Sequence, residues 1–215
     1  MKGRKGIADI SFLAIGLLIQ VVTYFLMPHD SWLSLVSGCL GVCSVCMAAQ
    51  RKIVTYLFGF GQVLTYTYLC WEQRFYGEVM INAYYFCTMI YGVYVWKSRM
   101  SDGTEGVVVP RSLSLRTLCL IVSVTFACAW LTGWGLASLT DDTQPYLDAF
   151  TTVPALVAQV LMILVYREHW FVWLAVDILS VVLWLRAGDY CMAAQYFFWC
   201  ANCIYGLRKW KIDNL

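Results

Sequence analysis

Charged residues are scarce in this chain, and their scarcity excludes most soluble folds. Only 13% of the 215 residues are Asp, Glu, Lys or Arg, whereas 61% are hydrophobic. A soluble domain carries about 25% charged residues, so water does not solvate this chain on all sides. The formal net charge is only +2, which gives no reason to expect nucleic acid as a partner.

Histidine is scarcer still, and this argues against an enzyme. The two histidines, His29 and His169, stand at the ends of apolar stretches and belong to no cluster of reactive residues. A catalytic site would need a nucleophile with its base, or a set of metal ligands. Cysteine is plentiful, but even the CxxC pair Cys43 and Cys46 has no charge or histidine near it, which favours packing at helix contacts. We therefore expect no enzymatic activity, no metal site and no cofactor.

The few charges divide the chain into long apolar windows. A helix needs roughly 17–25 apolar residues to cross the bilayer core, and each window meets or nearly meets that length. One of them is interrupted only by His169 and Asp177. The windows are 10–29, 31–50, 53–71, 79–96, 117–140, 149–166, 168–186 and 190–207. This pattern predicts an all-α integral membrane protein with eight transmembrane helices and no soluble domain.

The first window has a second interpretation. Three basic residues precede it, as in a secretory signal peptide. Its apolar run is long and ends in Met27, Pro28 and His29 rather than in a small-residue cleavage site, so we expect a retained helix.

The loops between the windows predict the orientation. When the loops are assigned alternately to two sides, 13 of the 15 Lys and Arg residues fall on one side, and only Arg74 and Arg186 on the other. Basic loops face the cytoplasm, so both termini are expected there, in a bacterial inner membrane. Omitting any one helix destroys this alternation.

The chain also repeats itself. Ile90, Tyr91 and Gly92 recur 114 residues later as Ile204, Tyr205 and Gly206. Because one further crossing separates the copies, both begin outside and end inside, which predicts a parallel 3+1+3 repeat of the SWEET-like kind. The predicted parts are an N-terminal helix (1–27), a first three-helix bundle (32–97), a loop with a linker helix (98–140) and a second bundle (146–211).

Polar residues deep inside the windows are candidates for a substrate site. Asp177 is the only acidic residue in mid-window, and Trp184 lies two helical turns further on the same face. In the last window Gln195, Trp199 and Asn202 form one stripe at helical spacing. The candidates in the first copy are Gln62, Asn82, Tyr85 and Thr88. The alternative is that the carboxyl and amide groups only bond neighbouring helices.

The remaining tryptophans have a simpler explanation. Trp and Tyr anchor membrane proteins at the lipid–water interface. Five lie near window ends and are expected to be such anchors: Trp32, Trp71, Trp96, Trp170 and Trp210. Trp199 lies at mid-depth, where this explanation is poor.

The chemistry of the candidates suggests a ligand. Amides bond hydroxyl and carboxamide groups, while tryptophans stack on flat rings and attract cations by about 0.5–2 kcal/mol. A lone carboxylate favours a permanent cation. The expected ligand is a flat, polyhydroxylated small molecule, either neutral or cationic.

The motif around Trp199 and Asn202, the Ile-Tyr-Gly-Leu-Arg-Lys-Trp that follows it, and the echo of that motif at 91–96 resemble the PnuC family of vitamin transporters. The resemblance covers nearly the whole chain from about residue 30. It implies uptake of nicotinamide riboside by facilitated diffusion, with trapping by a cytoplasmic kinase that phosphorylates the substrate. Other members that look similar carry thiamine or riboflavin, and the motif does not separate them.

These observations combine into one expected mechanism. Nicotinamide riboside binds near the bilayer midplane between the two bundles, which rock to expose it to either side. Trp199 and Trp184 flank the pyridinium ring, the amides of Asn202, Gln195 and Asn82 bond the ribose or carboxamide, and Asp177 balances charge. A proton-coupled carrier and a sugar carrier remain alternatives, and the sequence leaves open whether the chain forms a homo-oligomer.

Overall fold

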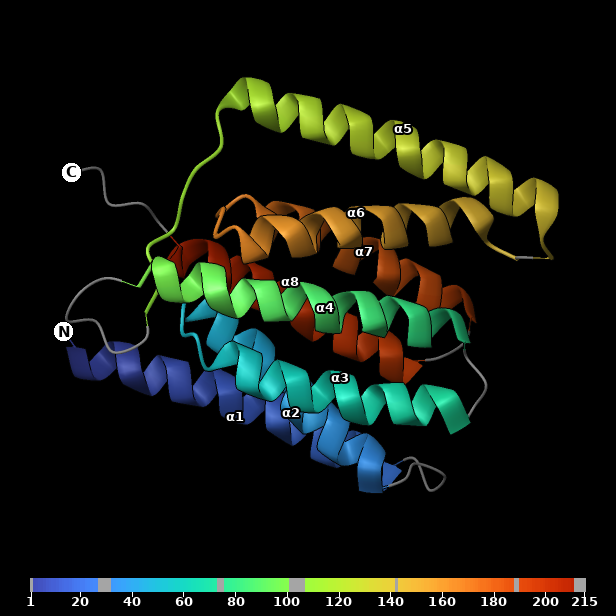
Figure 1. Ribbon diagram of the computed structural model, residues 1–215. Coiled ribbons are helices and arrows are strands. Elements are labelled where there is room, and N and C mark those ends of the chain that lie inside the picture. Colours follow the sequence, from blue (N-terminus) through green and yellow to red (C-terminus); the bar gives the residue numbers. More distant parts are fainter. Residues whose placement is uncertain are drawn as a thin grey trace. The chain divides into compact units, whose positions relative to one another are not determined.

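The computed structural model describes residues 2–26, 32–72, 76–100, 107–141, 143–187 and 190–210. Within these ranges the chain is helical, with isolated bridges as its only strand-like pairings. The described ranges contain eight helices, in agreement with the eight predicted windows (Figure 1). They are α1 (Lys2–Leu26), α2 (Trp32–Ala49), α3 (Thr55–Glu72), α4 (Tyr76–Ser98), α5 (Leu115–Leu139), α6 (Pro145–Ile163), α7 (His169–Ala187) and α8 (Tyr190–Lys209).

The helices belong to two compact units, Met1–Val109 and Pro110–Leu215. In the first unit α1 packs on α2, α2 on α3 and α3 on α4. In the second unit α5 packs on α6, α6 on α7 and α7 on α8, so both units have the same order of contacts. The predicted linker helix α5 thus packs within the second unit, in the way that α1 packs within the first. The parallel 3+1+3 arrangement itself stays a prediction.

The corner between the second and third helix of each unit repeats in backbone detail. Arg51 has a φ of 63° and Val165, 114 positions later, has a φ of 62°. In both corners the next amide donates to the carbonyl five residues back, from Lys52 to Met47 at 3.0 Å and from Tyr166 to Leu161 at 2.9 Å. This 6→1 bond ends a helix in a Schellman motif, which usually places glycine at the left-handed position. The duplication is therefore present in backbone geometry as well as in sequence.

A glycine and two aromatic rings fix the packing of the third helix on the fourth in each unit. In the second unit a Cβ on Gly206 would lie 2.5 Å from Trp170 Cε2, and the rings of Trp170 and Trp210 are 6.0 Å apart. In the first unit the ring of Tyr56 lies against Gly92 in the same way, and edge-on to Trp96 at 5.2 Å. Only a residue without a side chain allows an aromatic ring to approach a helix backbone this closely.

This packing corrects one expectation. Trp96, Trp170 and Trp210 are at most 3% exposed, so they are core residues and the prediction that they anchor the chain at the lipid interface is wrong. Trp32 and Trp71, by contrast, are 70% and 61% exposed. Position near a helix end is common to all five, and the three buried ones pack against a glycine or an aromatic ring on the neighbouring helix.

The segment before α5 adds backbone hydrogen bonds to both corners. Val108 N–H donates to the Arg51 carbonyl at 2.9 Å, within the first unit. In the second unit Arg111 N–H donates to the Val165 carbonyl at 2.8 Å, and the Arg111 carbonyl accepts from Arg167 N–H at 2.9 Å. Ser112 Oγ donates to Glu168 Oε1 at 2.7 Å. This segment therefore satisfies carbonyls that the helix ends would leave open.

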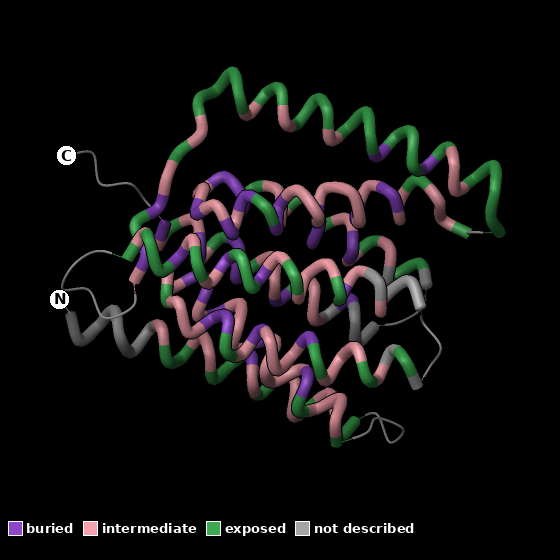
Figure 2. Tube along the Cα trace, viewed as in Figure 1, coloured by how far each residue is buried: buried purple, intermediate pink, exposed green. Residues whose placement is uncertain are grey.

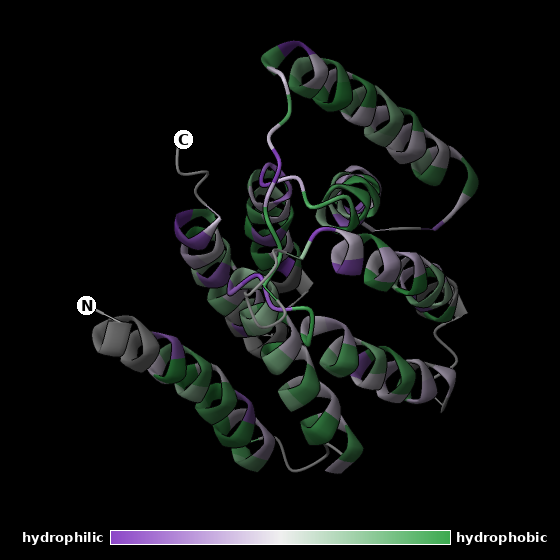
Figure 3. Cartoon of the chain, turned by 60° about the vertical axis from the view of Figure 1, so that its left-hand side comes forward, coloured by the Kyte–Doolittle hydropathy of each residue, from purple (hydrophilic) through white to green (hydrophobic). Residues whose placement is uncertain are grey.

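Hydrophobic side chains cover the outside of the helices. Figure 2 shows that α5 is exposed along most of its length, and Figure 3 shows hydrophobic residues along α1 and α5. Among the described residues four stretches are long and apolar enough to cross a membrane: Asp9–Leu26, Trp32–Ala49, Leu115–Leu139 and Pro145–Ile163. Exposed apolar surface on this scale requires a lipid environment, because water would not solvate it.

Candidate functional site

A buried carboxylate lies in the middle of α7. Asp177 is 3% exposed and occupies the ninth of the 19 positions of this helix. The thiol of Cys203, on the neighbouring helix α8, donates a hydrogen bond to Asp177 Oδ2 at 3.2 Å. Within the described part of the chain, Cys203 is the only hydrogen-bond partner of this carboxyl, and no basic side chain pairs with it. A buried carboxylate without a cation is costly, so this position favours a positively charged ligand or a proton.

The helical repeat of α8 brings the predicted stripe to the same side as Cys203. Residues three or four apart share a helix face, so Trp199 lies one turn from both Asn202 and Cys203. Asn202 is 2% exposed and Cys203 is 3% exposed. Gln195, one turn before Trp199, is half-buried. The face that α8 turns toward α7 thus carries amide, indole and thiol groups together.

The indole nitrogen of Trp199 donates no hydrogen bond to the described part of the protein. The ring is half-buried and packs edge-on against Tyr196, with centroids 5.0 Å apart. Its buried Nε1 atom has no hydrogen-bond partner among the described residues. Buried N–H groups are normally satisfied, so an indole left in this state is suited to a ligand acceptor or a water molecule.

The contacts between α7 and α8 also define their register. Trp170 lies against Gly206 and near Trp210, while seven residues further along α7 Asp177 meets Cys203. Because seven residues are about two turns, the carboxylate lies about 10 Å along the helix from the aromatic cluster. That cluster closes one end of the α7–α8 pair. Trp184 belongs to α7, but its side chain lies outside the described residues.

The four candidates of the first unit lie on α3 and α4. Asn82 is 4% exposed, whereas Tyr85 and Thr88 are half-buried. Thr88 Oγ1 donates to the carbonyl of Tyr84 in its own helix at 2.9 Å, so its hydroxyl proton is engaged locally. Gln62 is half-buried, with its Cγ 3.4 Å from the position of a Cβ on Gly41. This unit has no counterpart of the Asp177 carboxylate, because Val63 occupies the equivalent position.

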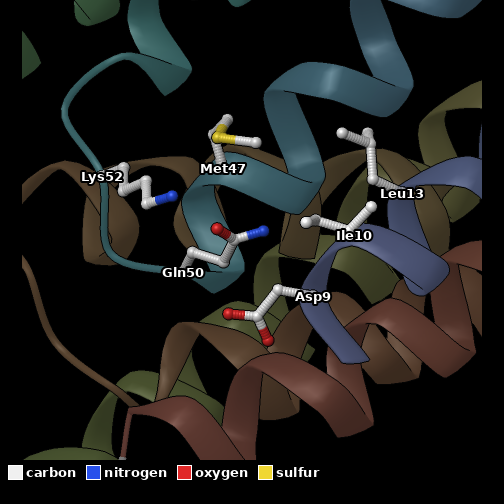
Figure 4. A pocket seen from close by; sticks show the side chains of 6 residues that line it. All are labelled: Asp9, Ile10, Leu13, Met47, Gln50 and Lys52. Carbon is white, nitrogen blue, oxygen red and sulfur yellow. The ribbon is translucent and has the colours of Figure 1, made fainter. Parts of the chain in front are cut away.

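Figure 4 shows a cavity in the first unit that none of the candidates lines. Its volume is about 230 Å³. The lining residues come from α1, the end of α2 and the corner after it: Asp9, Ile10, Leu13, Met47, Gln50 and Lys52. The site chemistry described above therefore does not coincide with this cavity.

Two buried residues on these faces were not among the sequence candidates. Cys203 is four residues after Trp199, and Ser180 is three residues after Asp177 and 3% exposed. Their spacing from a candidate was the available signal. A cysteine in an apolar helix usually serves only as a packing residue. Nothing in the sequence distinguished Cys203 from the other nine cysteines.

Comparison with known proteins decides the family. A family model described as "Nicotinamide mononucleotide transporter" matches residues 31–212. The chain is 33% identical to the nicotinamide riboside transporter PnuC of Haemophilus influenzae, over 94% of this chain and 88% of that protein. The chain belongs to the PnuC family of transporters. It is therefore a membrane transport protein and not an enzyme.

A solved structure and a more distant relative extend this result. The crystal structure of the vitamin B3 transporter PnuC matches with a TM-score of 0.78 and 32% identity, covering 94% of this chain and 89% of that one. The riboflavin/roseoflavin transporter RibM of Streptomyces davaonensis is 26% identical over 86% of this chain and 87% of its own length. The chain thus shares its fold with a PnuC transporter. It is also similar to a transporter that is named for a different vitamin. Residues before position 31, including all of α1, lie outside the family match.

Proposed function

We propose that the chain transports nicotinamide riboside across the bacterial inner membrane. Two observations support this substrate. Proteins that bear its name are the relatives with higher identity, and nicotinamide riboside carries a pyridinium cation, a carboxamide and a ribose. The observation that carries the proposal is the buried Asp177 carboxylate, which has no cationic partner in the described residues and lies one helix away from Trp199 and Asn202.

The site is assigned to α7 and α8. The indole of Trp199 stacks on the pyridinium ring, and cation–π attraction of this kind contributes about 0.5–2 kcal/mol. Asn202 and Gln195 bond the ribose hydroxyls or the carboxamide. Asp177 balances the positive charge of the ring. Trp184 is proposed as a second stacking partner. The first repeat is proposed to contribute further polar contacts to the substrate, from Gln62, Asn82, Tyr85 and Thr88.

The proposed topology follows the loop charges. Eight helices cross the membrane in a parallel 3+1+3 arrangement behind the N-terminal helix, with both termini in the cytoplasm. The repeated corners at Arg51 and Val165 support a duplicated origin of the two bundles.

The proposed energetics are facilitated diffusion. The site is exposed to the two sides of the membrane in turn, and a cytoplasmic kinase retains the substrate by phosphorylating it. Liposomes that contain only this protein test the point. Uptake down a substrate gradient should persist after the pH gradient is collapsed, and its disappearance would show that a proton is carried, with Asp177 as the first candidate to carry it.

A second candidate substrate is riboflavin, which is supported by the similarity to RibM. Thiamine and simple sugars complete the comparison. Calorimetric titration of the purified protein with nicotinamide riboside, thiamine, riboflavin and ribose decides among them. We expect saturable binding of nicotinamide riboside and at least tenfold weaker binding of the others; tighter binding of riboflavin would overturn the proposal.

A further inference from the structure

We infer that Cys203 is a positioning residue for substrate binding, and that it acts by holding the Asp177 carboxylate as a selector for positively charged rings. The inference rests on the proposed function, and it deepens that function by naming the substrate class. It concerns a residue that touches Asp177 and is not itself required to touch the substrate.

The carboxylate of Asp177 has no positively charged partner among the described residues. A buried carboxylate is usually paired with Arg, Lys or His, and the pair then has no net charge. Asp177 instead has a thiol as its only hydrogen-bond partner in the described part of the chain, at 3.2 Å. A thiol is a weak donor that brings no positive charge. The pair therefore retains the negative charge of the carboxylate for a ligand.

The hydrogen bond from Cys203 also orients the carboxyl group of Asp177. Cys203 bonds one oxygen, Oδ2, from the adjacent helix, and both side chains are 3% exposed. Fixing one oxygen limits rotation about the bond that joins the carboxyl group to its Cβ. The other oxygen, Oδ1, makes no hydrogen bond within the described residues and remains available to a cation.

Cys203 lies beside the other candidate residues of α8. Cys203 directly follows Asn202 and lies one helical turn from Trp199. The thiol thus connects the carboxylate of α7 to the aromatic and amide face of α8. A flat cation stacked on Trp199 would lie beside the group that neutralises it, whereas a neutral ring would leave the carboxylate buried and unbalanced.

The inference separates two kinds of ligand. Nicotinamide riboside is cationic, whereas its dihydropyridine form has nearly the same shape and no charge. Purified protein is titrated with both compounds by calorimetry, using the native chain, Cys203→Ala, Cys203→Ser and Asp177→Asn. The native chain should prefer the cation, and Cys203→Ala should lower affinity for the cation about tenfold, as for loss of one hydrogen bond to a charged group.

Three comparisons distinguish positioning from packing. Cys203→Ala should leave the affinity for the uncharged form within about twofold, because that ligand does not use the carboxylate. Cys203→Ser keeps a short donor and should retain affinity for the cation within about threefold. In the Asp177→Asn background, Cys203→Ala should have no further effect on the cation.

Equal losses for both ligands, or equal losses in Cys203→Ser and Cys203→Ala, would show that Cys203 only packs. Additive effects of the Asp177 and Cys203 changes would overturn the inference as well. If the native chain binds no nicotinamide riboside at all, the proposed function fails first. Normal binding that is insensitive to Cys203 would remove this inference alone.

Discussion

The indole of Trp170 occupies the space in which a side chain on residue 206 would begin. The nearest ring atom, Cε2, is 2.5 Å from the ideal Cβ position of Gly206, and two more ring atoms lie within 2.7 Å. Trp170 is 3% exposed and also packs against His169 and Trp210, so its ring has little freedom to move. The third and fourth helices of the second unit are thus as close as they are because residue 206 has no side chain.

Gly206→Ala should therefore destabilise the protein. Overpacking of a well-packed core costs about 1–3 kcal/mol, which exceeds the roughly 1 kcal/mol that alanine gains over glycine in a helix. Gly135→Ala is the matched control, because that helical glycine has no heavy atom within 4 Å of its ideal Cβ position. Thermal unfolding in detergent should show a lower midpoint for Gly206→Ala and an equal or higher midpoint for Gly135→Ala. An unchanged midpoint for both would mean that Trp170 moves aside at little cost.

Tyr56→Phe should stabilise the first unit. The Tyr56 hydroxyl is buried against Gly92 and has no hydrogen-bond partner among the described residues. Leaving such a group unsatisfied costs about 1–3 kcal/mol, so its removal should raise the free energy of unfolding by part of that amount. Tyr94, which is 72% exposed, is the control, and Tyr94→Phe should change nothing. A loss of stability in Tyr56→Phe would imply that the hydroxyl is bonded.

Arg51→Gly should also stabilise the chain, through the backbone. A non-glycine residue at a φ of 63° costs roughly 1–2 kcal/mol, and glycine removes that cost. Arg51→Val should be the least stable variant, because a β-branched residue tolerates this region poorly. Arg51→Ala removes the side chain but keeps the strain, so it should unfold close to the native midpoint. The order Gly, then native and Ala, then Val is the expected result; a Gly variant no better than Ala would contradict it.

Trp199→Ala should weaken binding of nicotinamide riboside about 30-fold, which corresponds to the upper end of a cation–π contact, about 2 kcal/mol. Trp199→Phe should retain part of the affinity, because it keeps a ring face for the cation but loses the Nε1 donor, which bonds no described protein group and is available to the ligand. Phe197→Ala is the control, since Phe197 is 71% exposed. If the double change Trp199→Ala with Asn202→Ala binds the riboside normally in a folded protein, the stripe on α8 serves packing alone.

The number and order of the helices could be predicted from the sequence, because charges are excluded from the bilayer core. The window 53–71 and the helix Thr55–Glu72 differ by two residues at one end and one at the other. The corners were not predictable in the same way. A left-handed backbone position is usually recognised in a sequence by a glycine, but here Arg51 and Val165 adopt it.

The candidate site was predictable in part. The stripe Gln195, Trp199 and Asn202 could be read from helical spacing, and Asp177 from its depth. Cys203 was missed because a thiol looks apolar until its partner is known. The wrong prediction that Trp96 and Trp210 are interfacial anchors has the same origin. The glycines four residues before them, Gly92 and Gly206, allow close packing only with aromatic rings of another helix, which the sequence does not show.

The hydrogen bond between Asp177 and Cys203 joins residues that are 26 positions apart, and that separation has a consequence for biosynthesis. Helix α7 leaves the ribosome before α8 exists, so its carboxylate enters the insertion machinery without its donor. An aspartate at the centre of a helix raises the apparent cost of insertion by about 2.5–3.5 kcal/mol. Helix α7 is therefore expected to commit to the lipid only when α8 follows, with the two helices entering as a hairpin.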